Sequence, residues 1–160
     1  MDASPASSDV VLLLKREFAS LIQRLCSLTR ATPAGSLYKN VGSLAVGVGI
    51  LKSAGVMEQT FGGITSNLWD DPFEWTLPEA LSTPELILEY LAEVDQARER
   101  AFSRITDDRA LYKLIALPSG ESCRLLQLLI MTLQRSSENY GQAAATLKFL
   151  SDVSASGFII

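Results

Sequence analysis

The chain has 160 residues, of which 48% are hydrophobic and 20% are charged, with a formal net charge of −4 and no histidine. This balance is typical of one folded domain with a sizeable core, and it excludes an intrinsically disordered chain. The acidic charge also argues against nucleic acid as a partner, because phosphate binding depends on clustered Lys and Arg.

Cysteine content and the apolar runs indicate the compartment. Cys26 and Cys123 are far apart in the sequence, which suits a reducing cytoplasm better than a disulfide-stabilised fold. Residues 1–9 lack the basic segment of a signal peptide. The longest apolar run, residues 41–57, is interrupted by Lys52 and is short for a membrane-spanning helix. We therefore expect a cytoplasmic protein that does not associate with a membrane.

Hydrophobic periodicity predicts a first helix over about residues 9–29. Its apolar side chains recur every three or four residues, which is the spacing of one helix face. They are Val11, Leu14, Phe18, Leu21, Leu25 and Leu28. Ser8 or Asp9 can cap the free amides at its start. The segment 32–35, which contains proline and glycine, then breaks the helix.

A second helix is predicted over about residues 41–61. Ala45, Gly49 and Ser53 recur at four-residue spacing, so they place small side chains on one face. A glycine inside a helix costs about 1 kcal/mol relative to alanine, so the glycines of this segment need a packing or ligand-access reason. The pair Gly62-Gly63 is expected to end the helix.

Residues 64–82 are predicted to form a long loop that carries both tryptophans. Long loops in compact domains are usually functional, but we favour the alternative that three aromatic side chains simply close one end of the molecule. They are Trp69, Phe73 and Trp75. Thr83 followed by Pro84 predicts the start of a third helix. Its expected buried stripe comprises Ile87, Leu91, Val94, Ala101, Phe102 and Ile105.

A fourth helix is predicted from just after Gly120 to about residue 150. Residues 125–133 are apolar nearly all round, which indicates a helix that is buried on several sides. One of those sides can pack against a second subunit, and the glycine-rich second helix offers further apolar surface. We therefore expect a homodimer with a two-fold axis. The link at residues 111–118 can hold a short extended piece.

Several sequence segments, taken in order, resemble the DinB/YfiT-like superfamily of four-helix-bundle metalloproteins. Residues 43–50 resemble the second-helix segment of that family, residues 83–86 the opening of its third helix, and residues 117–120 the turn before its last helix. The sharpest match is the run Glu138-Asn139-Tyr140-Gly141-Gln142. The resemblance covers about residues 8–150. It implies a single domain over residues 1–160, an all-α four-helix bundle with a long loop between helices two and three.

The chain departs from this family at the metal ligands. In the family, two histidines of the last helix and one of the second helix bind a divalent metal. The matching positions here hold Arg135, Asn139 and Ile50. None of these is a good ligand, because zinc and similar metals prefer His, Cys and carboxylate donors. We therefore expect no metal and no other cofactor, although the family includes thiol-dependent transferases and isomerases.

Polar residues at three/four spacing predict a polar seam along the last helix. They are Thr132, Arg135, Asn139, Gln142 and Thr146. The family geometry would point this seam into the bundle. We favour a structural role, in which Arg135 is buried and paired with an acid such as Glu58 or Glu138. The alternatives are that Arg135 holds a carboxylate-bearing ligand in fork geometry, or that the seam faces solvent.

The candidate ligand-binding cleft therefore comprises Ile50, Thr132, Arg135, Asn139 and Gln142. The favoured function is that of a bundle protein that has lost the family metal site and acts by dimerisation or by binding a small anionic or thiol ligand. The alternative is a metal-independent transferase or lyase, similar to thiol transferases, that uses the cleft around Arg135 and Asn139. The absence of histidine excludes Ser-His-acid and Cys-His catalysis, and catalytic residues stay unassigned.

Overall fold

The computed structural model describes residues 7–72 and 77–155. The described part is 72% helical with one small two-stranded sheet, which confirms the all-α prediction. Its four long helices are α1 (Asp9–Ala31), α2 (Val46–Ser66), α3 (Pro84–Ser103) and α4 (Leu125–Ala155). Shorter elements of this part are the 3-10 helices η1 (Ala34–Ser36) and η3 (Asp108–Tyr112) and the strands β1 (Leu114–Ala116) and β2 (Ser122–Arg124).

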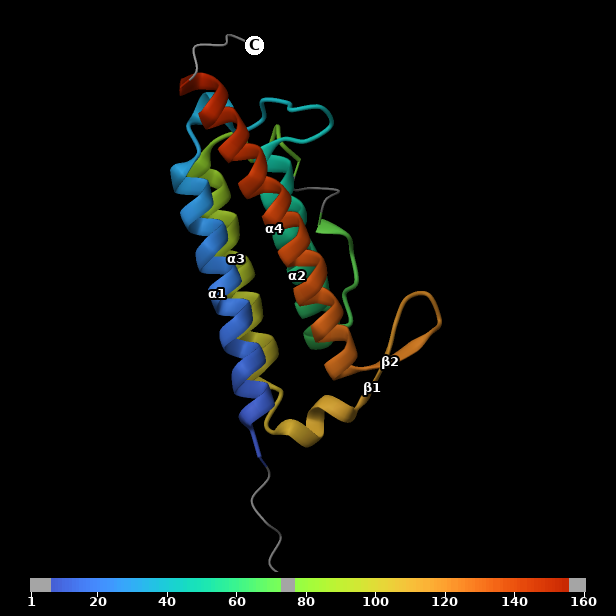
Figure 1. Ribbon diagram of the computed structural model, residues 1–160. Coiled ribbons are helices and arrows are strands. Elements are labelled where there is room, and N and C mark those ends of the chain that lie inside the picture. Colours follow the sequence, from blue (N-terminus) through green and yellow to red (C-terminus); the bar gives the residue numbers. More distant parts are fainter. Residues whose placement is uncertain (1–6, 73–76, 156–160) are drawn as a thin grey trace, which may run out of the picture.

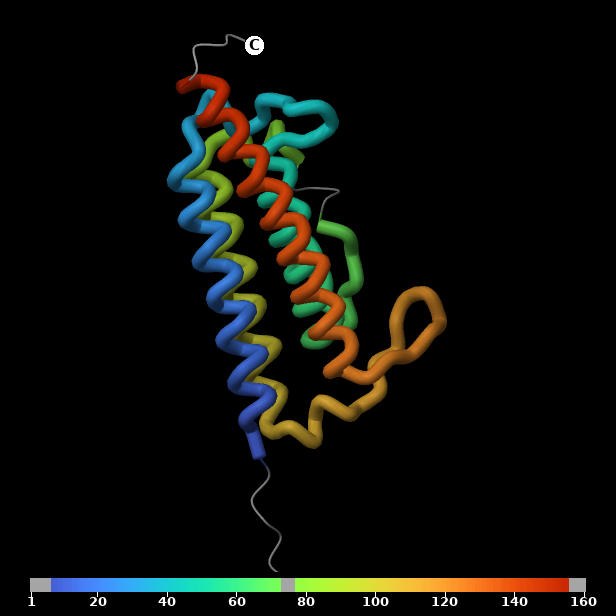
Figure 2. The backbone as a smooth tube through the Cα atoms, in the orientation of Figure 1, coloured from blue at the N-terminus to red at the C-terminus, as the bar shows by residue number. Residues whose placement is uncertain are grey.

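The long helices lie alongside one another. α1 and α4 run in one direction and α2 and α3 run in the other (Figures 1 and 2). Because α2 and α3 run the same way, the chain between them returns to the end at which α2 began. At the other end, η3 and the antiparallel β1–β2 hairpin connect α3 to α4 (Figure 1). α2 packs most extensively on α4 and then on α3, while α1 packs mainly on α3.

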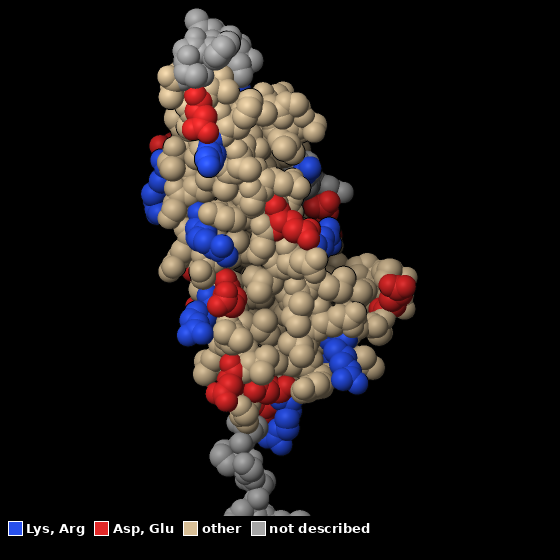
Figure 3. Space-filling view, viewed as in Figure 1, with Lys and Arg blue, Asp and Glu red and all other residues tan. Residues whose placement is uncertain are grey.

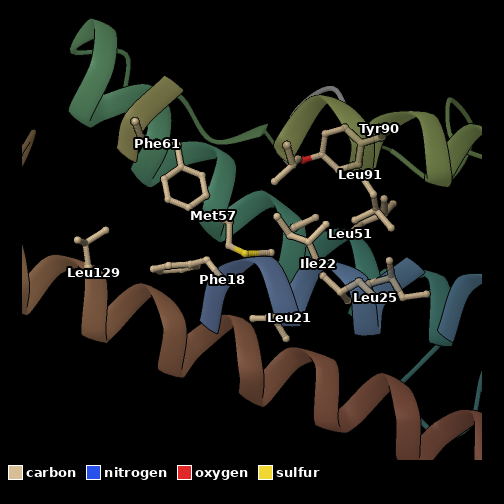
Figure 4. Close-up of a cluster of buried hydrophobic side chains, with 14 of the residues drawn as sticks. Phe18, Leu21, Ile22, Leu25, Leu51, Met57, Phe61, Tyr90, Leu91 and Leu129 are labelled. Atoms are coloured by element: carbon tan, nitrogen blue, oxygen red, sulfur yellow. The ribbon is translucent and has the colours of Figure 1, made fainter. Parts of the chain in front are cut away.

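The core lies between these helices and takes apolar side chains from each of them (Figure 4). The rings of Phe18 from α1 and Phe61 from α2 meet edge to face, with centroids 5.2 Å apart. Phe102 from α3 packs against both rings, and Leu129 supplies the α4 side of the core. Fully burying a side chain of this size contributes about 1.5–3 kcal/mol. The apolar stripes predicted for the first and third helices are buried as expected.

The bounds of α2 differ from the prediction at both ends. The helix begins at Val46 rather than near residue 41, and it continues through Gly62-Gly63 to Ser66. The prediction that the two glycines end it is therefore wrong. Asn67 ends it instead, because its φ of 55° is left-handed and its amide donates to the carbonyl oxygen of Gly63.

The start of α1 is stabilised by a residue of η3 rather than by its own cap. The side chain of Ser8 makes no cap hydrogen bond. The carboxylate of Asp108 accepts from the amides of Val11 at 2.9 Å and Val10 at 3.3 Å instead. Desolvation raises the pKa of this carboxyl, but the backbone hydrogen bonds outweigh it and leave the pKa below its usual range.

Predictions for the second half of the chain agree better with the structure. Thr83 caps α3 as expected, because its hydroxyl oxygen accepts from the amide of Leu86 at 3.3 Å and Pro84 follows it. β1 is the short extended piece expected at residues 111–118. α4 begins at Leu125 rather than just after Gly120, because residues 122–124 pair with β1 as β2, and it runs to Ala155, a few residues beyond the predicted end. Among the described residues, no helix combines the length and the apolar character that a membrane crossing requires.

Candidate functional site

Small side chains bring α2 and α4 close together. A Cβ atom added to Gly49 would lie 2.8 Å from the Cβ atom of Ala143 on α4. One turn further along α2, the buried hydroxyl of Ser53 donates to the carbonyl oxygen of Ser136 at 2.7 Å. The expected packing reason for a glycine in the second helix is therefore confirmed at Gly49. This contact lies within the chain, so the residue does not supply free apolar surface for a second subunit.

The chain that follows α2 folds back onto the helix through Trp69. Its indole ring lies against Gly63, where an added Cβ atom would be 2.3 Å from the ring. The side-chain amide of Gln59 donates to the carbonyl oxygen of Trp69 at 2.9 Å and holds the segment in place. Gly63 therefore permits a close approach rather than a helix end. Phe73 and Trp75, also expected to close one end of the molecule, lie outside the described residues.

Two neighbouring cavities open beside this contact and share Val56, Gln59 and Arg135 in their walls. The polar cavity has a volume of about 320 Å³ and is also lined by Lys52, Asp71 and Asn139. The apolar cavity has a volume of about 250 Å³. Its apolar lining includes Trp69, Leu117, Pro118, Leu128 and Met131. Cavities of this combined size are typical of sites for small molecules.

Arg135 stands where the two cavities meet. The residue is exposed, and its guanidinium forms no hydrogen bond or ion pair with a described residue. The acids expected to pair with it have other partners. Glu58 accepts from the hydroxyl of Tyr90 at 2.5 Å, and Glu138 accepts from a neighbouring glutamine of its own helix. The buried ion pair favoured from the sequence is therefore absent from the described residues.

The structure separates the five residues of the predicted cleft. Thr132 is buried, lines the apolar cavity and forms a 2.7 Å hydrogen bond with a threonine of α2. Asn139 lines the polar cavity and donates its side-chain amide to the carbonyl oxygen of Arg135 at 3.0 Å. Ile50 is fully buried in the core and Gln142 is exposed, and neither lines these cavities. Thr132, Arg135 and Asn139 thus come together, whereas the other two do not.

A larger cavity of about 560 Å³ lies elsewhere, in a groove between α1 and α3. Arg98 lines this groove and is only 5% exposed. Its guanidinium donates to Asp95 at 2.8 Å and to Glu99 at 2.7 Å. These acids compensate the charge of Arg98, so its guanidinium is less available to an anion than the guanidinium of Arg135. Arg30 of α1 also lines the groove and is exposed. Sequence reasoning missed Arg98, because a charged residue on a striped helix is normally assigned to the exposed face.

Cys26 also lines the groove between α1 and α3. Burial raises the pKa of its thiol, the nearby Arg30 opposes this, and Asp95 reinforces it. A thiol with a raised pKa is mostly protonated at neutral pH, and the thiolate is the nucleophilic form. This position therefore favours a packing role for Cys26 over a catalytic one.

A second buried titratable contact joins α2 to α3. Burial raises the pKa of Glu58, the hydrogen bond from Tyr90 lowers it, and the neighbouring Glu93 raises it, with a net upward shift. Burial and the charge of Glu79 also raise the pKa of Tyr38 to about 12. None of these residues lines the cavities beside Arg135.

The divalent metal implied by the family resemblance does not fit the residues of the cleft. Arg135 places a positive charge at its centre, Asn139 offers only an amide, and Ile50 lies in the core. Within residues 7–72 and 77–155, no group of three or more Cys, Asp or Glu side chains could hold a metal ion. The arrangement can instead bind an anion through a guanidinium and an amide.

No protein-family model, curated protein or solved structure matches this chain.

Proposed function

We propose that this protein is a divergent DinB-like four-helix bundle that has lost the metal site and binds a small anionic ligand between α2 and α4. Two features support the bundle assignment. The sequence motifs occur in the family order, and four long helices lie alongside one another with a long connection between α2 and α3 (Figure 1). The ligand-binding role is supported by the two cavities that share Arg135.

The observation that carries the binding proposal is the guanidinium of Arg135, which has no partner among the described residues and lies at the junction of the cavities. The described charged residues that line the polar cavity are Lys52, Arg135 and Asp71, which together carry a formal charge of +1. Arginine presents paired N–H donors that match a carboxylate or phosphate. A small anion would therefore find both charge and hydrogen-bond donors at this position.

Thermal unfolding with a panel of small anions tests the proposal. Phosphate, acetate, succinate and glutathione would each be added to the wild type, to Arg135→Ala and to Arg100→Ala, an exposed arginine of α3 outside both cavities. A ligand present at about one hundred times its Kd stabilises the folded state by about 2.7 kcal/mol, which raises Tm by several degrees. We expect this shift in the wild type and in Arg100→Ala only. Equal shifts in all three proteins, or none, would contradict the proposal.

Metal-independent transfer in the same cleft is the alternative function. This function requires more than a ligand bound in the cleft, because a thiol must be activated and an electrophile must be held beside it. Incubating the protein with glutathione and a chromogenic electrophile would separate the two functions. Binding without turnover above the Arg135→Ala background supports the proposal, and turnover that depends on Arg135 would replace it with the transferase.

The proposed loss of the metal site has its own test. Protein purified without chelators should contain no stoichiometric zinc, nickel or iron, because Arg135 and Asn139 supply no suitable donors. Elemental analysis measures this directly. A bound transition metal that disappears in the Asn139→Ala variant would show that the site is a metal centre after all.

We further propose that α4 supplies the face of a homodimer. Residues 125–134 carry no charged side chain, and Figure 3 shows an uncharged surface over this part of α4. Ile130 is 51% exposed, so part of the apolar stretch is not covered within the chain. Light scattering should report a dimer for the wild type and for Leu12→Asp, but a monomer for Ile130→Asp. A wild-type monomer at high micromolar concentration would refute the dimer.

A further inference from the structure

The two cavities beside Arg135 differ in chemistry, and this difference defines a ligand class. We propose that the ligand is an amphipathic carboxylate, whose charged group binds Arg135 and whose apolar tail lies in the apolar cavity. This inference rests on the proposed anion binding and adds the chemical nature of the tail.

The polar end of the ligand would meet two side chains of one helix face. Arg135 and Asn139 are one turn apart on α4, so both reach the polar cavity. One hydrogen of the Asn139 amide is used by the carbonyl oxygen of Arg135, and this bond orients the amide. The second hydrogen remains for a ligand oxygen. The guanidinium and this amide therefore both offer donors to an anion in the polar cavity.

The net charge of this end favours a monoanion. Among the described lining residues, Lys52 and Arg135 are positive and Asp71 is negative, which is a formal charge of +1. A monocarboxylate neutralises that charge, whereas a phosphate dianion would leave an excess negative charge next to Asp71. The planar fork of arginine also matches a planar carboxylate through two parallel hydrogen bonds.

The apolar end is formed by side chains from four parts of the chain, one of which is Val56 of α2. Trp69 is held on one wall by its contact with Gly63, and Leu117 and Pro118 of the β1–β2 turn form another. Met131 of α4 completes the lining although it is 48% exposed. Methionine is unbranched and adapts its shape to an apolar partner. A tail that covers these side chains would remove apolar surface from water, which is favourable.

Arg135 is shared by both cavities, so one molecule can occupy both. A carboxylate at the guanidinium has the polar cavity on one side and the apolar cavity on the other. An alkyl or aryl substituent therefore has one apolar direction in which to extend, toward Trp69 and Met131. A short anion such as acetate would use only the guanidinium.

Affinity measurements on a homologous series test this arrangement. Acetate, butanoate, hexanoate and octanoate would be titrated by calorimetry, with octanamide as the uncharged counterpart of octanoate. The same titrations in a Trp75→Phe background leave Trp69 as the single tryptophan, so its fluorescence reports occupancy of the apolar cavity. We expect the affinity to rise roughly threefold per buried methylene, and octanamide to bind about tenfold more weakly than octanoate.

Two pairs of variants assign the ends of the ligand. Arg135→Ala should weaken octanoate binding about tenfold, whereas Arg100→Ala should not. Met131→Ser should weaken octanoate binding several-fold and leave acetate unchanged. Its matched control is Phe149→Ser, because Phe149 is 47% exposed on the same helix and lines neither cavity.

The possible outcomes separate this inference from the proposed function. If acetate or phosphate binds as tightly as octanoate and the fluorescence of Trp69 does not respond, the anion site stands and the amphipathic ligand is refuted. If octanoate and octanamide bind equally, or if Arg135→Ala binds octanoate normally, the site is merely apolar and the inference fails. If no anion of any length binds, the proposed function itself fails.

Discussion

Replacing Gly49 with alanine should destabilise the protein, although alanine is the better helix former. The added methyl group would lie 2.8 Å from the Cβ atom of Ala143 and 3.3 Å from the carbonyl oxygen of Asn139. Non-bonded carbon atoms pack without repulsion at about 3.5–4.0 Å. Neither neighbour can rotate away, because one is a Cβ atom fixed to the backbone and the other is a backbone atom. α2 and α4 must therefore move apart.

Two opposing terms set the magnitude of this change. Helix propensity favours alanine by about 0.8–1 kcal/mol. Overpacking a close contact costs about 1–3 kcal/mol. Moving the helices apart also weakens the nearby hydrogen bond between Ser53 and Ser136, and such a bond contributes about 1 kcal/mol. The clash therefore outweighs the propensity, and we expect the free energy of unfolding to fall by about 1–2 kcal/mol.

Gly141 provides the matched control on α4. It is helical and exposed, and an added Cβ atom would meet nothing within 4 Å. Gly141→Ala should raise the free energy of unfolding by about 0.5–1 kcal/mol. Both substitutions change the unfolded chain in the same way, so the difference between the two variants reports the α2–α4 contact alone.

Urea denaturation followed by circular dichroism measures both variants. Gly49→Ala should have the lower midpoint and Gly141→Ala the higher one, with the same slope against urea. The double variant Gly49→Ala/Ala143→Gly should be more stable than additivity of the single changes allows, because it removes the opposing Cβ atom. If Gly49→Ala is stabilised as much as Gly141→Ala, the close approach of the two helices is refuted.

Three further substitutions test other contacts. Glu58→Gln retains an acceptor for Tyr90 but cannot ionise. The folded state raises the pKa of Glu58 and so binds its proton more tightly, so wild-type stability should fall relative to this variant as pH rises from about 4 to 7. Parallel pH profiles of the two proteins would contradict this. Arg98→Ala removes two charged hydrogen bonds from a side chain that is 6% exposed and should cost about 2 kcal/mol in urea denaturation; a loss below about 0.5 kcal/mol would show that the ion pairs contribute little. The buried hydroxyl of Ser136 has no partner among the described residues, so Ser136→Ala should raise the midpoint of urea denaturation. Ser53→Ala should lower this midpoint, because it removes the hydrogen bond to Ser136. A lower midpoint for Ser136→Ala would reveal a partner for that hydroxyl.

Features that depend on local periodicity could be predicted from the sequence. The buried faces of α1 and α3 follow from apolar residues at three/four spacing, and all the residues named for them are buried. The cap at Thr83 could also be predicted, because its signal consists of adjacent residues. In both cases, the interaction that decides the structure is contained in a few consecutive turns.

Features that depend on distant residues could not be predicted. The sequence around Gly63 predicts a helix end, but in the structure the ring of Trp69 packs against this glycine. Asp108 caps α1 from a position 97 residues from Val11. No local pattern encodes either contact, because each arises only after the chain has folded back on itself.

The candidate site shows the same limit at the scale of one helix. Thr132 and Arg135 are three residues apart and appear on one polar seam, yet the first is buried against α2 and the second is exposed. Three residues correspond to about 300° around a helix, so such neighbours differ in direction by about 60°. That difference is enough to place one side chain inside a close interface and the other at its edge.

The position of Arg135 follows from this geometry and from the small residues around it. Gly49, Ser53 and Ser136 bring α2 and α4 into direct contact, which leaves no room for a long side chain between the helices. Arg135 must therefore emerge at the border of the interface, where the segment around Trp69 forms the opposite wall. A guanidinium buried between the helices would need an acid partner, whereas one at this border stays hydrated and free to bind a ligand. The close packing of the interface and the open, charged cavity beside it thus have a common cause.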